Sequence, residues 1–280
     1  MTTLPLMLAC TDGSPASRGA VQAALALAPR WPAGICFLQV LEFNPGFASQ
    51  ALDYIHKWER EAESHLADLR DQAAARGIAA DTRIISGQTA FRAILSTAAA
   101  LKAALIIMGR HGHTGLNRLL MGSATARVIG FAPMPVVVVP RDAPLTFRRL
   151  LAASDGSPYG RAAWNYALEL APKFGAELFA LSAAPEFRDI PAAEAIVRDM
   201  LASAAARGLA PHSLALEGRP EEAIVAAAGS QGADLIIMGS HGRTGLTRLL
   251  MGSVTERVIG LAPCPVMVVK PPGEAAAPLS

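Results

Sequence analysis

The chain has 280 residues, of which 52% are hydrophobic and 5% aromatic, and its formal net charge is +2. This length allows one large domain or two ordinary ones, each able to bury a core without disulfide staples. The balanced charge, without a Lys/Arg cluster, argues against a nucleic-acid partner, and no apolar run reaches the ~18 residues that a membrane span needs.

The first half alternates short apolar runs with amphipathic stretches, which predicts strands and helices in turn. Asp12-Gly-Ser14-Pro15 marks the turn from the first strand into a helix, with Ser14 as the cap and Pro15 at the first helical position. The expected strands are 4–9, 35–41, 78–86, 105–108 and 136–139, and the expected helices are 16–28, 49–76, 89–101 and 123–131. Strands that alternate with helices predict a parallel sheet covered on both faces.

The pattern restarts after a join at residues 140–148. Between Met108 and Val139, 24 of 32 positions are identical to Met238–Val269. A hydrophobic core alone tolerates far more drift than this, so something besides packing maintains the likeness. We therefore expect two repeated domains followed by a disordered tail. The expected bounds are 1–142, 147–272 and 273–280.

The cysteines and the N-terminus bear on the compartment. Cys10, Cys36 and Cys264 are odd in number and scattered, which argues against a disulfide framework and for a reducing compartment. The sequence begins Met-Thr-Thr-Leu-Pro without a basic segment, so we expect no secretory leader. The expected localisation is the cytoplasm.

One stretch in each half carries the strongest indication of a binding site. The runs Met108–Ser123 and Met238–Ser253 both present Gly-x-x-Gly, nine residues and Gly-Ser, after a short buried strand and before a helix. Glycines permit positive φ, which turns main-chain N–H groups inward. Ser123 and Ser253 are the expected N-caps, and a helix start adds unpaired donors and a favourable dipole. The combination predicts a phosphate site built mainly from main chain.

A carboxylate is expected beside each of these glycine stretches. In an open parallel sheet, ligands bind beyond the carboxyl ends of the strands where the strand order reverses. Asp12 and Gly109 follow the first and fourth strands of the first half, and Asp155 and Gly239 follow those of the second. If those strands are neighbours, each crevice suits a nucleotide, with the carboxylate bonding to ribose or base. Helix capping alone is the alternative role of both aspartates.

These motifs resemble the ATP-binding branch of the universal stress protein family, and the likeness covers essentially the whole chain, twice, as in tandem members. The resemblance implies an α/β fold of two doubly wound domains similar to the adenine-nucleotide alpha hydrolases. Each would have a five-stranded parallel sheet in the order 3-2-1-4-5, with helices on both faces. It also implies ATP as ligand, with or without Mg²⁺. It further implies a pseudo-dimer of the two domains through Val136–Val139 and Val266–Val269, and it allows a homodimer.

The resemblance also assigns the nucleotide contacts. In the first half they are Thr11, Asp12, Val40, Gly109, Arg110, His111, Gly112, His113, Thr114, Gly115, Gly122, Ser123, Ala124 and Thr125. In the second half they are Ser154, Asp155, Ala183, Gly239, Ser240, His241, Gly242, Arg243, Thr244, Gly245, Gly252, Ser253, Val254 and Thr255. The halves differ at Arg110, expected either to add charge for a phosphate or to fill the crevice, and at Ala183, which offers less apolar contact than Val40.

The leading interpretation is a regulatory protein of the stress response that binds ATP without turning it over rapidly. No Gly-x-x-x-x-Gly-Lys-Ser/Thr occurs, which excludes a P-loop NTPase, and no Gly-x-Gly-x-x-Gly occurs, which disfavours a dinucleotide dehydrogenase. We expect no catalytic residues and no metal site. Two alternatives stay open: slow ATP hydrolysis or self-phosphorylation in the same crevice, and an interaction module whose sites are vestigial.

Overall fold

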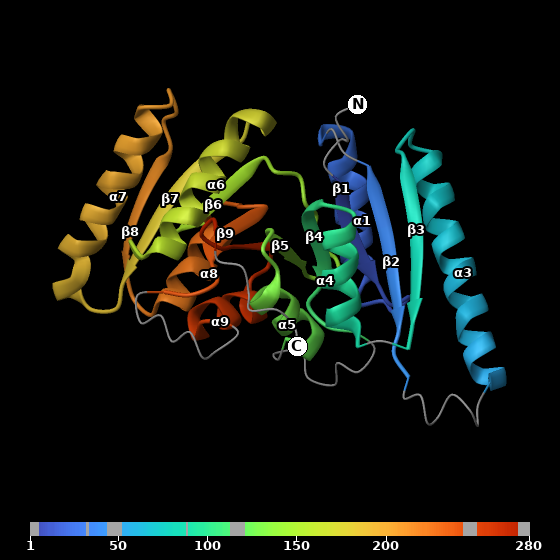
Figure 1. The fold of residues 1–280 in the computed structure, drawn as a ribbon. Coiled ribbons are helices and arrows are strands. Elements are labelled where there is room, and N and C mark those ends of the chain that lie inside the picture. The colour runs from blue at the N-terminus through green and yellow to red at the C-terminus, as the bar shows by residue number, and fades with distance from the viewer. Residues whose placement is uncertain are drawn as a thin grey trace.

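The computed structural model of the chain describes residues 6–31, 34–43, 52–87, 89–112, 121–242 and 251–273. In this part of the chain the strands form one ten-stranded sheet in the order β3-β2-β1-β4-β5-β10-β9-β6-β7-β8. Neighbouring strands are parallel except β5 and β10, which pair antiparallel at the centre of the sheet. Figure 1 shows the two halves on either side of that central pair.

Each half carries the same succession of elements. The first contains β1 (Leu6–Thr11), α1 (Arg18–Leu27), η1 (Ala28–Arg30), β2 (Ile35–Leu41), α3 (Leu52–Ala74), β3 (Ala80–Ser86), α4 (Ala90–Ala100), β4 (Ala103–Gly109), α5 (Ser123–Phe131) and β5 (Val136–Val139). The second contains β6 (Arg149–Ala153), α6 (Pro158–Phe174), β7 (Glu177–Ala184), η2 (Phe187–Asp189), α7 (Ile190–Ala205), β8 (His212–Glu217), α8 (Pro220–Ser230), β9 (Leu235–Gly239), α9 (Ser253–Leu261) and β10 (Val266–Val269). The predicted order 3-2-1-4-5 is confirmed in both halves.

The sheet is buried on both faces, as strands made of continuous Val, Ile and Leu require. One apolar cluster packs α1, α3, α6 and α7 onto one face, and a second packs α4, α5, α8 and α9 onto the other. In β4, Leu105 and Ile107 belong to the first cluster, and Ile106 and Met108 belong to the second. Each cluster contains residues of both halves, so the apolar layers run without interruption across the β5–β10 pair.

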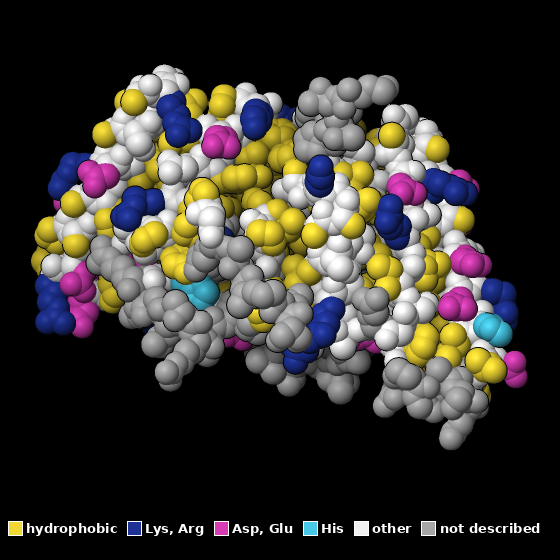
Figure 2. Space-filling view, in the orientation of Figure 1, with side chains coloured by type: hydrophobic (Ala, Val, Ile, Leu, Met, Phe, Trp, Pro, Cys, Tyr) yellow, Lys and Arg dark blue, Asp and Glu magenta, His cyan; other side chains and the backbone are white. Residues whose placement is uncertain are grey.

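The surface carries both signs of charge. On the face shown in Figure 2, Lys and Arg side chains are interspersed with Asp and Glu, in keeping with the near-neutral net charge. In the described part of the chain, no helix combines the length and apolar character that a membrane crossing needs.

The join between the halves is packed into the core. The Phe147 side chain is fully buried, and its ring meets Phe174 edge-on at 4.8 Å and Trp31 at 6.4 Å between centroids. Asp234, which the first half replaces with Ala104, accepts a hydrogen bond from the Thr146 hydroxyl in this segment. The segment between the halves is therefore anchored to both of them.

The first helix of the first half begins later than the sequence predicts. α1 begins at Arg18, so the prediction that Ser14 caps it and that Pro15 is its first residue is wrong. The Ser14 hydroxyl donates to Asp12 Oδ1 at 2.6 Å, and the residues before Arg18 form a turn closed by Ser17 N–H donating to the Ser14 carbonyl at 3.2 Å. These local hydrogen bonds compete with the helix for the same backbone.

Candidate functional site

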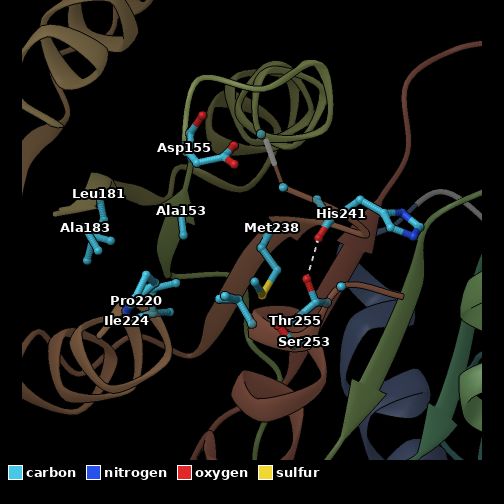
Figure 3. Close-up of a pocket in the computed structure, with 16 residues that line it drawn as sticks. Ala153, Asp155, Leu181, Ala183, Pro220, Ile224, Met238, His241, Ser253 and Thr255 are labelled. Carbon is cyan, nitrogen blue, oxygen red and sulfur yellow. Dashed lines mark hydrogen bonds between the residues drawn. The ribbon is translucent and has the colours of Figure 1, made fainter. Parts of the chain in front are cut away.

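A cavity opens at the C-terminal edge of the second half of the sheet, close to the starts of α6, α8 and α9 (Figure 3). It encloses about 170 Å³, against the ~15 Å³ that one ordered water needs, so it has room for an organic ligand. The lining residues are Ala153, Ser154, Asp155, Gly160, Leu181, Ala183, Pro220, Ile224, Met238, Gly239, His241, Gly242, Gly252, Ser253, Val254 and Thr255. β6 and β9 are the strands between which the order reverses, the place where open parallel sheets bind ligands.

One wall of this cavity is apolar. Leu181 and Ala183 of β7 lie beside Pro220 and Ile224 from the first two turns of α8, and Met238 of β9 lies between this wall and Thr255 (Figure 3). Such a wall suits a planar, weakly polar group. Of the five residues in this apolar wall, sequence reasoning gave only Ala183 as a nucleotide contact. The missed signal was the position of Pro220: in an α/β sheet, a helix that follows a parallel strand starts at the ligand-binding edge.

The opposite wall brings a carboxylate against the glycine stretch. A Cβ placed on Gly242 would stand 2.9 Å from Asp155 Oδ2, and one on Gly112 would stand 2.9 Å from Asp12 Oδ2. Each Oδ1 accepts the main-chain N–H of the serine two residues on, at 3.0 Å, which fixes the carboxylate. In both halves, therefore, the second oxygen of the carboxylate faces the loop that follows the fourth strand.

The loop glycines act through their missing side chains, and the expectation of positive φ is wrong for those that the structure describes. Among the loop glycines that the structure describes, none has a positive φ, whereas the glycines of the two Asp-Gly-Ser turns do. A Cβ on Gly239 would stand 2.6 Å from Tyr159 Cβ, and one on Gly109 would stand 2.9 Å from the Ala16 carbonyl oxygen. The ends of β9 and β4 thus pass the neighbouring helix start so closely that only glycine fits.

The helices that follow the loops start at the mouth of each crevice. α5 and α9 begin at Ser123 and Ser253, and their N-caps are Gly122 and Gly252 without a side-chain cap bond, so the predicted serine N-caps are wrong. The serines are the first helical residues. The N–H groups of the first turn have no partner within the helix and carry its positive dipole end. Ser253 therefore adds a hydroxyl to an anion-binding helix start.

Comparison with known proteins identifies the family. A family model described as the Universal stress protein family matches residues 6–140 and matches again over residues 146–270. The chain belongs to the universal stress protein family.

Two of the relatives described here match this chain over most of its length, and a third matches a little less than half of it. A universal stress protein of Mycolicibacterium smegmatis is 30% identical over 257 residues, covering 86% of this chain and 83% of that protein. One from Methanocaldococcus jannaschii is 35% identical over 142 residues, covering 45% of this chain and 84% of that protein. The crystal structure of a universal stress protein from Archaeoglobus fulgidus superposes with a TM-score of 0.78 at 26% identity, covering 95% of this chain and 98% of that one.

Two threonines of this universal stress protein tie the helix starts to the strand ends. Thr125 Oγ1 donates to the Gly109 carbonyl at 3.1 Å, and Thr255 Oγ1 donates to the Gly239 carbonyl at 2.9 Å (Figure 3 shows the second). Both threonines are buried. Their hydroxyls position the helix start over the strand end. Sequence reasoning grouped them with the nucleotide contacts and gave them no such role.

Arg110 is directed away from the first-half crevice. Its guanidinium donates to the carbonyls of Gly260 and Ala262, at 2.9 Å each, at the C-terminal end of α9 in the other half. Burial lowers the pKa of this guanidinium below its ordinary value, while a cation at a helix C-terminus is favourable. A second contact runs from the second half to the first: Lys270 Nζ donates to the Gly130 carbonyl in the last turn of α5. The Arg110 side chain thus joins the halves, a role that neither sequence-based expectation included.

Three further groups of predicted contacts have distinct places in the structure. Thr11 and Ser154 are buried, and their hydroxyls accept the N–H of the turn glycines two residues on, at 3.1 and 3.2 Å. Val40 and Ala183 lie at equivalent places in β2 and β7, packed against the second apolar cluster. His113, Thr114, Gly115, Arg243, Thr244 and Gly245 lie outside the residues that the structure describes.

Proposed function

We propose that this universal stress protein binds ATP, with or without Mg²⁺, at one crevice in each of its two domains, 1–142 and 147–272, and acts as a regulator in a stress response. The observation that carries the proposal is the second-half cavity. There an apolar wall, a fixed carboxylate and the start of α9 surround one space. An adenine nucleotide offers a complementary apolar base, hydroxyl donors and an anionic tail.

Different lining residues would contact the base, the ribose and the phosphates of the nucleotide. The base would lie against the wall formed by Leu181 and Ile224, which shields it from water. Asp155 Oδ2 would accept hydrogen bonds from ribose hydroxyls. Phosphate oxygens would lie near Ser253 and the main-chain amides of Gly239–Gly242, where a helix start favours negative charge. Mg²⁺ would be carried chiefly by the phosphates, since the described residues hold no cluster of three metal-ligating side chains.

We propose binding without rapid turnover. Phosphoryl transfer depends on neutralising the charge that develops on the transferred group. Among the described residues that line the cavity there is no lysine or arginine. A steady-state phosphate-release assay tests this: we expect no release above background in wild type. Release that disappears in Gly242→Ala but persists in Gly229→Ala would instead support the slow ATPase alternative.

We also propose that the domains act as an intramolecular pseudo-dimer in the cytoplasm. Antiparallel pairing of Val136–Val139 with Val266–Val269 supports the first part of this proposal. The three cysteines, all buried and unpaired, support a reducing compartment. Size-exclusion chromatography with light scattering separates a 29.2 kDa monomer from a homodimer.

Equilibrium dialysis with ATP tests the central proposal. Wild type should bind below millimolar ATP, and Gly242→Ala should bind at least tenfold more weakly, because the added methyl displaces the Asp155 carboxylate. Gly229→Ala in α8 is the control, since nothing lies within 4 Å of a Cβ there. Absence of binding to wild type at millimolar ATP would contradict the proposal.

A further inference from the structure

A buried carboxylate beside the second-half cavity joins two helices that border the cavity. Glu221 lies in the first turn of α8, next to Pro220 and three residues before Ile224, which both line the cavity. Its Oε1 accepts a hydrogen bond from Arg257 Nη1 of α9 at 2.6 Å. α9 begins at Ser253, another lining residue. The Glu221–Arg257 pair therefore links the helix that supplies part of the apolar wall to the helix whose start suits an anion.

This carboxylate stays ionised although little of it meets solvent. Only 5% of the Glu221 side chain is exposed, and Arg219 Nη2 approaches the same Oε1 at 3.0 Å. Burial alone would raise the pKa of Glu221, but hydrogen bonds from its own main-chain N–H and from Arg257, with the charges of both arginines, hold it below its ordinary value. Separating the partners would leave a buried charge poorly compensated, which is costly. The pair therefore holds α8 and α9 at a fixed spacing.

The next carboxylate in the chain makes a different contact. The Glu222 side chain is 62% exposed, and its ion pair is with Arg219 Nη1 at 3.2 Å. Arg219 is the N-cap of α8, so this pair stays within the start of one helix. Glu222 thus carries the same charge at the same helix start as Glu221, in a pair that does not bridge to α9.

The first half joins the equivalent helices through another kind of contact. Phe91 of α4 is the counterpart of Glu221, and Arg127 of α5 is the counterpart of Arg257, since 221 − 91 and 257 − 127 both equal 130. The Arg127 guanidinium lies 5.0 Å from the centroid of the Phe91 ring, which is a cation–π contact. Equivalent arginines therefore hold the two helix starts together in both halves, one on a ring and the other on a carboxylate.

We propose that Glu221 is a positioning residue for the nucleotide of the second half: through Arg257, it sets the spacing between the wall that receives the base and the helix start that receives the phosphates. The inference rests on the proposed function and goes beyond it by giving a role to residues outside the cavity lining. ATP spans both helices and so depends on this spacing. Adenosine, which has no phosphates, would use only the wall and Asp155. The pair thereby favours the nucleotide over the nucleoside.

Isothermal titration of the full chain with ATP and with adenosine measures this preference. The variants all carry Gly112→Ala, whose methyl stands 2.9 Å from Asp12 Oδ2 and should weaken the first-half crevice. In this background, Glu221→Gln and Arg257→Gln should each lower the affinity for ATP roughly fivefold or more, and that for adenosine less than about twofold. Thermal unfolding followed by circular dichroism checks that each variant folds. Arg257, with 54% of its side chain exposed, provides the test if Glu221→Gln does not fold.

Two matched changes are the controls. Glu222→Gln removes the neighbouring charge from the same helix start, and Arg127→Gln makes the arginine change in the first half. Both should leave the two affinities within about twofold. Unchanged ATP affinity in Glu221→Gln, a parallel loss of ATP and adenosine affinity, or an equal ATP loss in either control would overturn the inference while leaving the proposed function intact. No ATP binding by wild type at millimolar concentration would instead overturn the proposed function itself.

Discussion

The first and second halves use the same loop position for different purposes. At the residue after the fourth strand, the buried Ser240 of the second half lies 3.1 Å from His241 Nδ1 through its hydroxyl, whereas Arg110 of the first half reaches α9 across the molecule. The main chain is nevertheless alike: the carbonyls of both residues accept the N–H of Gly122 or Gly252, at 3.0 and 2.8 Å. The two halves therefore share the same backbone geometry at this position, while the Arg110 side chain of the first half is used to contact the second half.

The largest expected effect on stability concerns the join between the halves, where Phe147 is buried. Phe147→Ala removes a fully buried ring between Phe174 and Trp31, and such a truncation costs about 3–5 kcal/mol. Urea unfolding monitored by circular dichroism measures the loss. Phe187→Ala, at a ring that is 77% exposed, is the control and should change stability by less than ~0.5 kcal/mol. Equal effects of the two changes would contradict a packed join.

Equivalent glycines at the ends of β9 and β4 allow the closeness of packing to be compared between the halves. Gly239→Ala forces a Cβ within 2.6–2.9 Å of Tyr159, including its backbone, which should cost about 1–3 kcal/mol. Gly109→Ala meets its closest atom, the Ala16 carbonyl oxygen, at 2.9 Å, so the cost should be smaller. Chemical denaturation of both variants decides the order. A more destabilised first half would mean that its turn is the tighter one.

The next largest effect on stability concerns Arg110, the cation that links the first half to α9. Arg110→Ser gives the first half the residue of the second and removes two charge-assisted hydrogen bonds to α9, with an expected loss of about 2 kcal/mol. Arg188→Ser is the control, since its pair with Glu186 is exposed and contributes ~0–1 kcal/mol. Thermal unfolding compares the two. An unchanged midpoint for Arg110→Ser would show that this contact contributes nothing to the link between the halves.

The smallest expected effect is a pH dependence peculiar to the first half. Burial lowers the pKa of His65 below its ordinary value of 6.5, although Asp68 and Asp12 raise it in part. Because the folded-state pKa is depressed, the stabilising contribution is present above pH 6.5 and is lost as the pH falls through the folded-state pKa. Wild type should therefore lose more stability than His65→Gln between pH 7 and pH 5. Parallel pH profiles of thermal unfolding would show no such divergence if His65 were not coupled to folding.

Much of the fold follows from local sequence pattern. The strands 35–41 and 136–139 and the helix 123–131 have the predicted bounds, because short β-branched runs and glycine boundaries specify them without distant partners. The strand order followed from family resemblance rather than from the pattern itself. The start of α1 was mispredicted because the contacts of Ser17 override a local proline signal.

The candidate site could be predicted only in part from the sequence, for the same reason. The spacing of the motifs identifies the aspartate and the glycine stretch in the sequence, and the structure brings them together. The apolar wall at Pro220 and Ile224, and the reach of Arg110 to a helix 150 residues away, depend on tertiary packing that carries no local pattern. The nucleotide contacts expected at residues 113–115 and 243–245 stay predictions, because these residues lie outside the part of the chain that the structure describes.

Native mass spectrometry of the intact chain, titrated with ATP, tests the central claim most directly. The account predicts that each chain takes up ATP below millimolar concentration, to at most two ATP per chain. A chain that takes up no ATP at millimolar concentration would contradict it.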